Sequence, residues 1–129
     1  MNIPFDPTEE LVYLWAEVLG PTGKARLLLA LDTGATSTLV SKTRLIELGY
    51  DPEASKEQSR IITGSQSETV SHLKLTRFSA LGQQRKRFDV CCYNLPVATG
   101  VDGVLGLDFF RGQNLNIDFR NGLITVVVP

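Results

Sequence analysis

The sequence predicts a mostly β, barrel-like domain with a single short helix. Short apolar or alternating runs recur along the 129 residues, and turns rich in glycine, proline and asparagine separate them. Only one segment carries the start and stop signals of a helix. The length fits a single domain, residues 1–129, and no internal repeat interrupts the pattern.

The apolar runs predict about seven or eight strands, and two pairs of them form clear hairpins. The first hairpin turns at 20–24, where glycine and proline gather. The last turns at Asn121-Gly122, a pair that tolerates positive φ at both positions. Further turns are expected at 64–67 and 82–86. The clearest predicted strands are 11–19, 25–31, 59–63, 68–75, 87–93, 115–119 and 123–128.

The one predicted helix spans residues 42–48. Ser41 can accept a hydrogen bond from the first turn as the N-cap, and Gly49 can end the helix. The following segment, 50–59, is polar and contains a proline, so we expect a loop there.

An acidic residue follows the buried run Leu27–Leu31 directly. A carboxylate at the buried end of a strand is costly unless it is hydrogen-bonded, paired or used in chemistry. Gly34 permits a tight turn after Asp32, and Thr33 and nearby amides can donate to the carboxylate. The same pattern also fits an Asp that caps a strand-to-turn junction. The motif alone therefore leaves a catalytic and a structural role open.

The charge balance argues against nucleic-acid and acidic-membrane partners, since the formal net charge is -1. One basic cluster, residues 84–87, is interpreted as the solvated tip of a hairpin because no aromatic residues accompany it. No apolar run is long enough to span a membrane, and the N-terminal residues lack the features of a secretory signal. We therefore expect a cytoplasmic protein without membrane contact.

Cysteine and histidine usage predicts neither a disulfide framework nor a metal site. Cys91 and Cys92 are adjacent in a predicted strand, where neighbouring side chains point to opposite faces. A single histidine, His72, lies in an alternating strand and is interpreted as structural. We expect no metal and no cofactor.

The order of these parts resembles the retropepsin-like (retroviral-type) aspartic protease family, in its cellular or bacterial branch. A hairpin leads to Asp32-Thr33-Gly34-Ala35, and a helix and a second hairpin with a small-residue tip follow. Near the end comes Val104-Leu105-Gly106-Leu107-Asp108, and then a last hairpin. The resemblance covers residues 11–128 and implies a single-lobe acid-protease barrel.

The resemblance implies an aspartic endopeptidase that acts on polypeptides, with Asp32 as the catalytic residue. It implies active-site support from Thr33, Gly34, Ala35, Gly106 and Asp108. It places a mobile, substrate-binding flap at Ile62, Thr63, Gly64, Ser65 and Gln66. The flap tip is more polar than the glycine-rich, apolar tips common in the family.

A single Asp-Thr-Gly implies a homodimer. Two carboxylates about 3 Å apart share one proton, so that one acts as base and the other as acid on the same water. This chain has one such motif, so the second carboxylate must come from a second copy around a two-fold axis. Family members interleave their terminal strands across that dimer, and we expect the same for residues 123–128.

Two other classes of protein fit parts of the sequence. The first is a catalytically silent retropepsin-like module that dimerises or binds peptides. The second is an unrelated β-barrel that binds a small ligand, with Asp32 as a capped turn. Cleavage of an unfolded protein separates both from the protease.

Overall fold

The computed structural model describes residues 2–63 and 65–129, except the side chains of Thr63 and Val97. Ten strands, one α-helix and three short 3-10 helices lie in this part of the chain. The strands are β1 (Asn2–Pro4), β2 (Tyr13–Gly20), β3 (Gly23–Leu31), β4 (Leu39–Ser41), β5 (Gln58–Thr63), β6 (Gln66–Ala80), β7 (Gln83–Tyr93), β8 (Gly103–Leu105), β9 (Asn114–Asp118) and β10 (Leu123–Val127). The helices are α1 (Lys42–Glu47), η1 (Pro52–Ala54), η2 (Val97–Thr99) and η3 (Leu107–Phe109).

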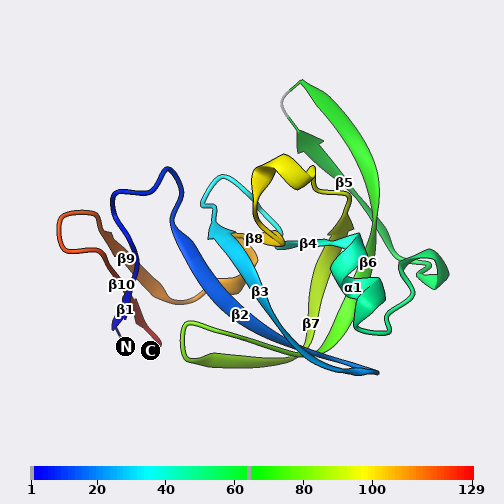
Figure 1. Cartoon of the computed structure of the whole chain (residues 1–129), viewed down its shortest axis with the longest axis horizontal. Helices are drawn as coiled ribbons and strands as arrows, with labels where there is room; N and C mark the ends of the chain where they lie inside the picture. Colours follow the sequence, from blue (N-terminus) through cyan, green and yellow to red (C-terminus); the bar gives the residue numbers. More distant parts are fainter. Residues whose placement is uncertain (1, 64) are drawn as a thin grey trace.

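A closed barrel forms the body of the molecule. Its strands follow the order β2-β3-β8-β4-β7-β6, and β6 pairs with β2 to complete the circle. The outer half of β6 leaves the barrel with β5 as a hairpin that projects from the body, at the upper right of Figure 1. The predicted fold class, a mostly β acid-protease barrel with one α-helix, is confirmed.

The barrel is filled by the inward-facing residues of these strands. In β2, buried Leu14, Ala16 and Val18 alternate with partly or fully exposed neighbours, which is the period of a strand with one face in the core. The aromatic rings of Phe78, Phe88 and Phe109 pack edge-on or tilted at the centre. This core holds the ends of β3 and β8 in fixed positions.

A separate small sheet joins the two ends of the chain. Its order is β1-β10-β9, so β10 is hydrogen-bonded on both sides within one chain. Figure 1 shows the two termini side by side at this sheet. The expectation that β10 reaches across to a second chain is therefore wrong for this strand, because neither of its edges is free.

The hairpin between β6 and β7 differs from the prediction. Its turn is only Leu81-Gly82, with φ of 50° and 73°, the backbone of a two-residue turn that matches strand twist. Residues 83–86 belong to β7, so the basic cluster at 84–87 lies inside a strand and not at a hairpin tip. Its polar residues suggested a turn, but they form the solvent-facing part of a long strand.

The helix prediction is confirmed. Ser41 is the N-cap of α1, and its side chain accepts from the amide of Arg44. The segment predicted as a loop contains the short η1, and β1, β4 and β8, each three residues long, were not predicted. Strands of this length carry too few residues to show a period. In the described residues, no helix is long and apolar enough to cross a membrane.

Candidate active site

Asp32 lies at the point where β3 leaves the barrel. The amide of Leu31 donates to the carbonyl of Val12 at 2.9 Å, and the amide of Asp32 donates to the carbonyl of Leu105 at 2.9 Å. The chain then turns, and the Gly34 amide donates to Oδ1 of Asp32 at 2.8 Å. The Asp32 side chain is exposed. The carboxylate is thus oriented by its own turn and presented outward.

The loop after Asp32 packs against the segment that joins β8 to η3. The amide of Leu107 donates to the carbonyl of Ala35 at 2.8 Å. A Cβ on Gly106 would lie 2.7 Å from the carbonyl carbon of Ser37 and 2.8 Å from the carbonyl oxygen of Ala35. Only glycine allows this close approach of two backbones. Gly106 therefore lies directly against the Asp32 loop, where the resemblance placed it.

Asp108 and Thr38 connect the same two segments. The hydroxyl of Thr38 donates to one carboxylate oxygen of Asp108 at 2.7 Å, and its amide donates to the other at 2.9 Å. The Thr38 hydroxyl also accepts from the amide of Gly106 at 3.1 Å. Thr38 is fully buried, so each polar atom of this cluster has its partner inside the protein. Thr38 was not singled out in the sequence, although it lies only three residues after Ala35, the last residue of the motif.

The other late aspartates are engaged in structural contacts. Asp102 accepts from the amide of Leu28 at 2.9 Å and lies 3.5 Å from the guanidinium of Arg44. Asp118 accepts from the side-chain amide of Asn121 and from the backbone amides of Asn121 and Arg120, and these hydrogen bonds, the side-chain one most strongly, lower its pKa. Asp32 therefore differs from them in facing solvent from a braced loop.

A pocket of about 290 Å³ lies between the Asp32 loop and the projecting hairpin. From the loop it is lined by Gly34, Ala35, Thr36, Ser37 and Leu39, and from β5 by Arg60, Ile61 and Ile62. The structure thus brings predicted support residues and Ile62 of the predicted flap to one cavity. Ile62 is 81% exposed, which leaves a large apolar side chain available at the hairpin end.

The remaining predicted flap residues lie at the end of the same hairpin. Ser65 and Gln66 are exposed and do not line this pocket. Gly64 and the side chain of Thr63 are outside the described residues. The Thr33 side chain, at the base of the site, is also exposed.

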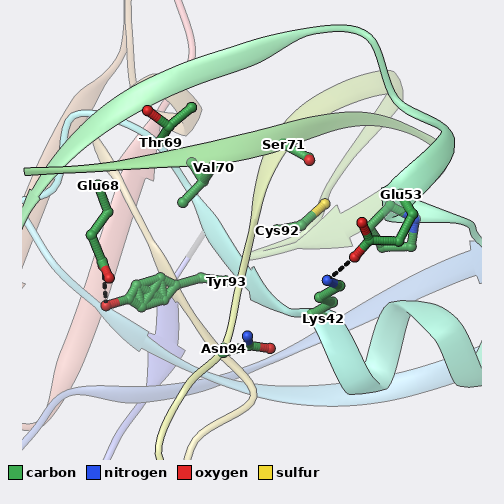
Figure 2. Close-up of a pocket in the computed structure, with 10 residues that line it drawn as sticks. Lys42, Glu53, Glu68, Thr69, Val70, Ser71, Cys92, Tyr93 and Asn94 are labelled. Carbon is green, nitrogen blue, oxygen red and sulfur yellow. Dashed lines mark hydrogen bonds and ion pairs between the residues drawn. The ribbon is translucent and has the colours of Figure 1, made fainter.

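A second cavity, of about 260 Å³, lies at the base of the hairpin and contains none of the predicted site residues. Figure 2 shows Glu68 of β6 accepting from the hydroxyl of Tyr93 of β7, at 2.8 Å. Lys42 of α1 pairs with Glu53 of η1 across the same cavity. The first contact links the hairpin strand β6 to β7 of the barrel, and the second links α1 to η1.

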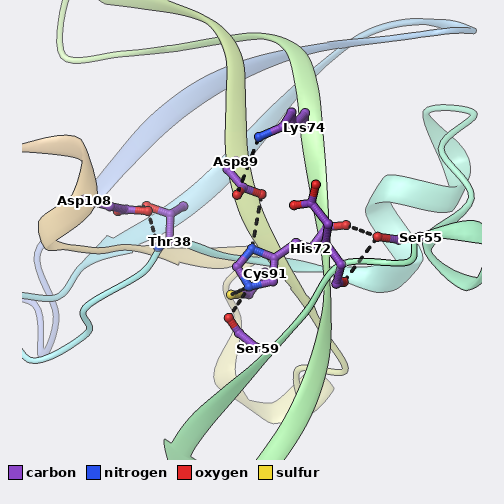
Figure 3. Close-up of polar contacts among 9 residues, drawn as sticks. Thr38, Ser55, Ser59, His72, Lys74, Asp89, Cys91 and Asp108 are labelled. Carbon is purple, nitrogen blue, oxygen red and sulfur yellow. Dashed lines mark hydrogen bonds and ion pairs between the residues drawn. The ribbon is translucent and has the colours of Figure 1, made fainter.

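His72 joins three strands at the root of the hairpin. Its ring bonds the hydroxyl of Ser59 on β5 through Nε2 and lies 3.2 Å from Asp89 on β7 through Nδ1 (Figure 3). Nε2 also lies 3.8 Å from the sulfur of Cys91. This is a structural position, as expected for His72. The sequence did not show its partners because they are distant along the chain.

Both cysteines are free and buried. Burial raises the pKa of Cys91 to about 11, with further contributions from the charges of Asp89 and Asp108. Burial also raises the pKa of Cys92 to about 11. Neither thiol is a reactive nucleophile at neutral pH, since the thiolate is the reactive form. Among the described residues, no group of His, Cys, Asp and Glu could hold a metal ion.

The sequence profile of the aspartyl proteases matches residues 18–109, a segment that includes the Asp32 loop, the projecting hairpin and Gly106. The chain belongs to the aspartyl protease family. The chain shares its fold with the crystal structure of a retropepsin-like aspartic protease from Rickettsia conorii. The TM-score is 0.70 and the identity 20%, over 98% of this chain and 89% of that one. No curated protein matches the chain by sequence.

Proposed function

We propose that this aspartyl protease is an aspartic endopeptidase in which Asp32 is the catalytic carboxylate. The observation that carries the proposal is an exposed carboxylate on a loop held by Thr38, Gly106 and Asp108. A pocket next to this loop is covered by the projecting hairpin. Catalysis needs a reactive group held in fixed geometry beside a space for substrate, and this arrangement provides both.

The active unit we propose is a homodimer that places two copies of Asp32 at its two-fold axis. A single exposed carboxylate cannot act as acid and base on the same water. The amide of Leu31 bonds to the carbonyl of Val12, so Leu11, which is 44% exposed and lies in the bend just before β2, is close to the chain at Asp32. An exposed leucine next to the proposed axis favours a contact between protomers.

The chemistry follows from two carboxyl groups that share one proton. The ionised carboxylate takes a proton from a water molecule as the water attacks the scissile carbonyl carbon. The protonated carboxyl donates its proton to the carbonyl oxygen, which gives a neutral tetrahedral intermediate. Transfer of a proton to the amide nitrogen then breaks the C–N bond and releases an amine and a carboxylic acid.

The substrate we propose is an extended polypeptide between the Asp32 loop and the β5–β6 hairpin, with its backbone bonded as an added strand. The apolar residues that line the pocket include Ala35, Leu39, Ile61 and Ile62. These side chains favour apolar substrate side chains in the pocket. Arg60, the one charged residue that lines the pocket in the described part of the chain, donates to the hydroxyl of Ser67.

The test is Asp32→Asn, which keeps the size of the side chain and its acceptor oxygen for the Gly34 amide. We expect cleavage of an unfolded protein at mildly acidic to neutral pH by the native chain and none by the variant. Asp51→Asn, at an exposed cap of η1, is the matched control and should keep full activity. Equal cleavage by Asp32→Asn would refute the mechanism. Peptide binding without cleavage by either protein would indicate the silent binding module.

A further inference from the structure

The strands β6 and β7 carry a group of cations, which we call the basic patch: Lys74, Arg77, Lys86 and Arg87. Arg77 is half-buried, and the other three are exposed. Arg77 of β6 and Lys86 of β7 are directly opposite each other in the register. Like charges in this position destabilise a sheet. The patch is also unusual for a chain with a formal net charge of -1.

A local break in the strand pattern turns these side chains to one face. Leu75 and Phe78 are both fully buried, so Thr76 and Arg77 between them both face outward. Opposite them, Arg87 has φ of 53°, in the left-handed region that L residues seldom adopt. The amide of Thr76 donates to the hydroxyl of Tyr50 at 2.9 Å. Two consecutive outward positions on each strand bring the cations together.

The patch surrounds an open groove of about 500 Å³, lined by Lys74, Thr76, Lys86 and Arg87. Lys74 lies 3.9 Å from Asp89, which also contacts His72. Within the described residues, Arg77, Lys86 and Arg87 form no ion pair. The acid on the neighbouring β2, Glu17, pairs with Lys24. The groove therefore keeps a net positive charge that the chain itself does not neutralise.

We propose that the basic patch is an exosite, a docking surface outside the active site, for an acidic segment of the polypeptide substrate. The proposal rests on the proposed protease function. Carboxylates complement exposed lysine and arginine side chains, and β6 leads directly from the patch to the flap. Among the described residues, none that lines the groove is aromatic, so the groove offers no surface on which nucleic-acid bases could stack.

The test uses a peptide with one cleavable core and either an acidic tail or a neutral tail of equal length. For the native protein, the acidic tail should lower KM about five- to tenfold and leave kcat unchanged, as expected for a few exposed ion pairs. High salt should remove the difference. Lys74→Glu/Lys86→Glu should abolish or reverse the preference. Arg111→Glu/Arg120→Glu, an equal charge change on exposed turn residues, should retain it.

A binding measurement separates this inference from the protease assignment. Fluorescence anisotropy of the labelled acidic peptide with Asp32→Asn needs no turnover. Patch-dependent binding to this variant, together with no cleavage of the peptide by the native protein, would support the exosite and refute the protease. Cleavage with the same KM for both tails would refute the exosite alone. Tighter binding of a single-stranded oligonucleotide than of the acidic peptide would overturn the proposed partner.

Discussion

At the scale of single residues, the buried hydroxyl of Thr38 organises the candidate site. It donates to Asp108 and accepts from the amide of Gly106, so one side chain ties the Asp32 loop to β8 and η3. Asp32 could be selected from the sequence because its motif is local. Thr38 could not, since its partners lie 68 and 70 residues away.

Thr38→Val should lower the free energy of unfolding by about 2–3 kcal/mol, because it leaves buried polar groups on Asp108 and Gly106 without a partner. Urea unfolding measures the change. Thr125→Val is the matched control, since that hydroxyl bonds to Asn2 at an exposed position. We expect its cost to be below about 1 kcal/mol. Equal costs for the two variants would contradict the role of Thr38.

At the scale of elements, the long hairpins and the one α-helix could be predicted from periodicity and capping. The boundaries of the strands could not be predicted in this way, and β7 is an example. Its first half is polar and basic, which is typical of a turn, yet pairing with β6 holds it as a strand. The candidate site also depends on β4 and β8, which are three residues long. Their extent is determined by the strands they pair with, and the sequence has no hydrophobic period that would reveal them.

The two buried cysteines of β7 should make the free energy of unfolding depend on pH in the alkaline range. Unfolded thiols ionise near their ordinary pKa of 9.0, and the folded ones only near about 11, so the unfolded state releases protons first. The free energy of unfolding should fall as pH rises between these values, by up to about 1.4 kcal/mol per pH unit for each thiol.

Urea unfolding from neutral pH to about pH 10.5 follows this window of thiol ionisation. Cys91→Ala/Cys92→Ala is the control, and its stability should decline less steeply because the two buried thiols are gone. The same alkaline slope in both proteins would assign the effect to other groups.

At the scale of the whole molecule, the proposed activity depends on two copies of the chain. Leu11→Arg should place like charges beside the proposed two-fold axis, where such contacts cost several kcal/mol. We expect a folded monomer by sedimentation velocity and at least about a tenfold loss of cleavage, since 1.4 kcal/mol already corresponds to tenfold. Ile46→Arg, at an apolar residue of similar exposure on α1, should leave both measurements unchanged. A dimeric, active Leu11→Arg protein would place the axis elsewhere.

The small sheet of β1, β10 and β9 has a consequence for how such a dimer would be assembled. Because both ends of the chain are secured within one protomer, folding does not have to wait for an encounter with a second copy. Folding and association would then be separate steps, and the monomer would be a folded chain with only one of the two proposed catalytic carboxylates. Cleavage per chain would then rise with protein concentration at constant stability, so abundance itself would govern when the enzyme works.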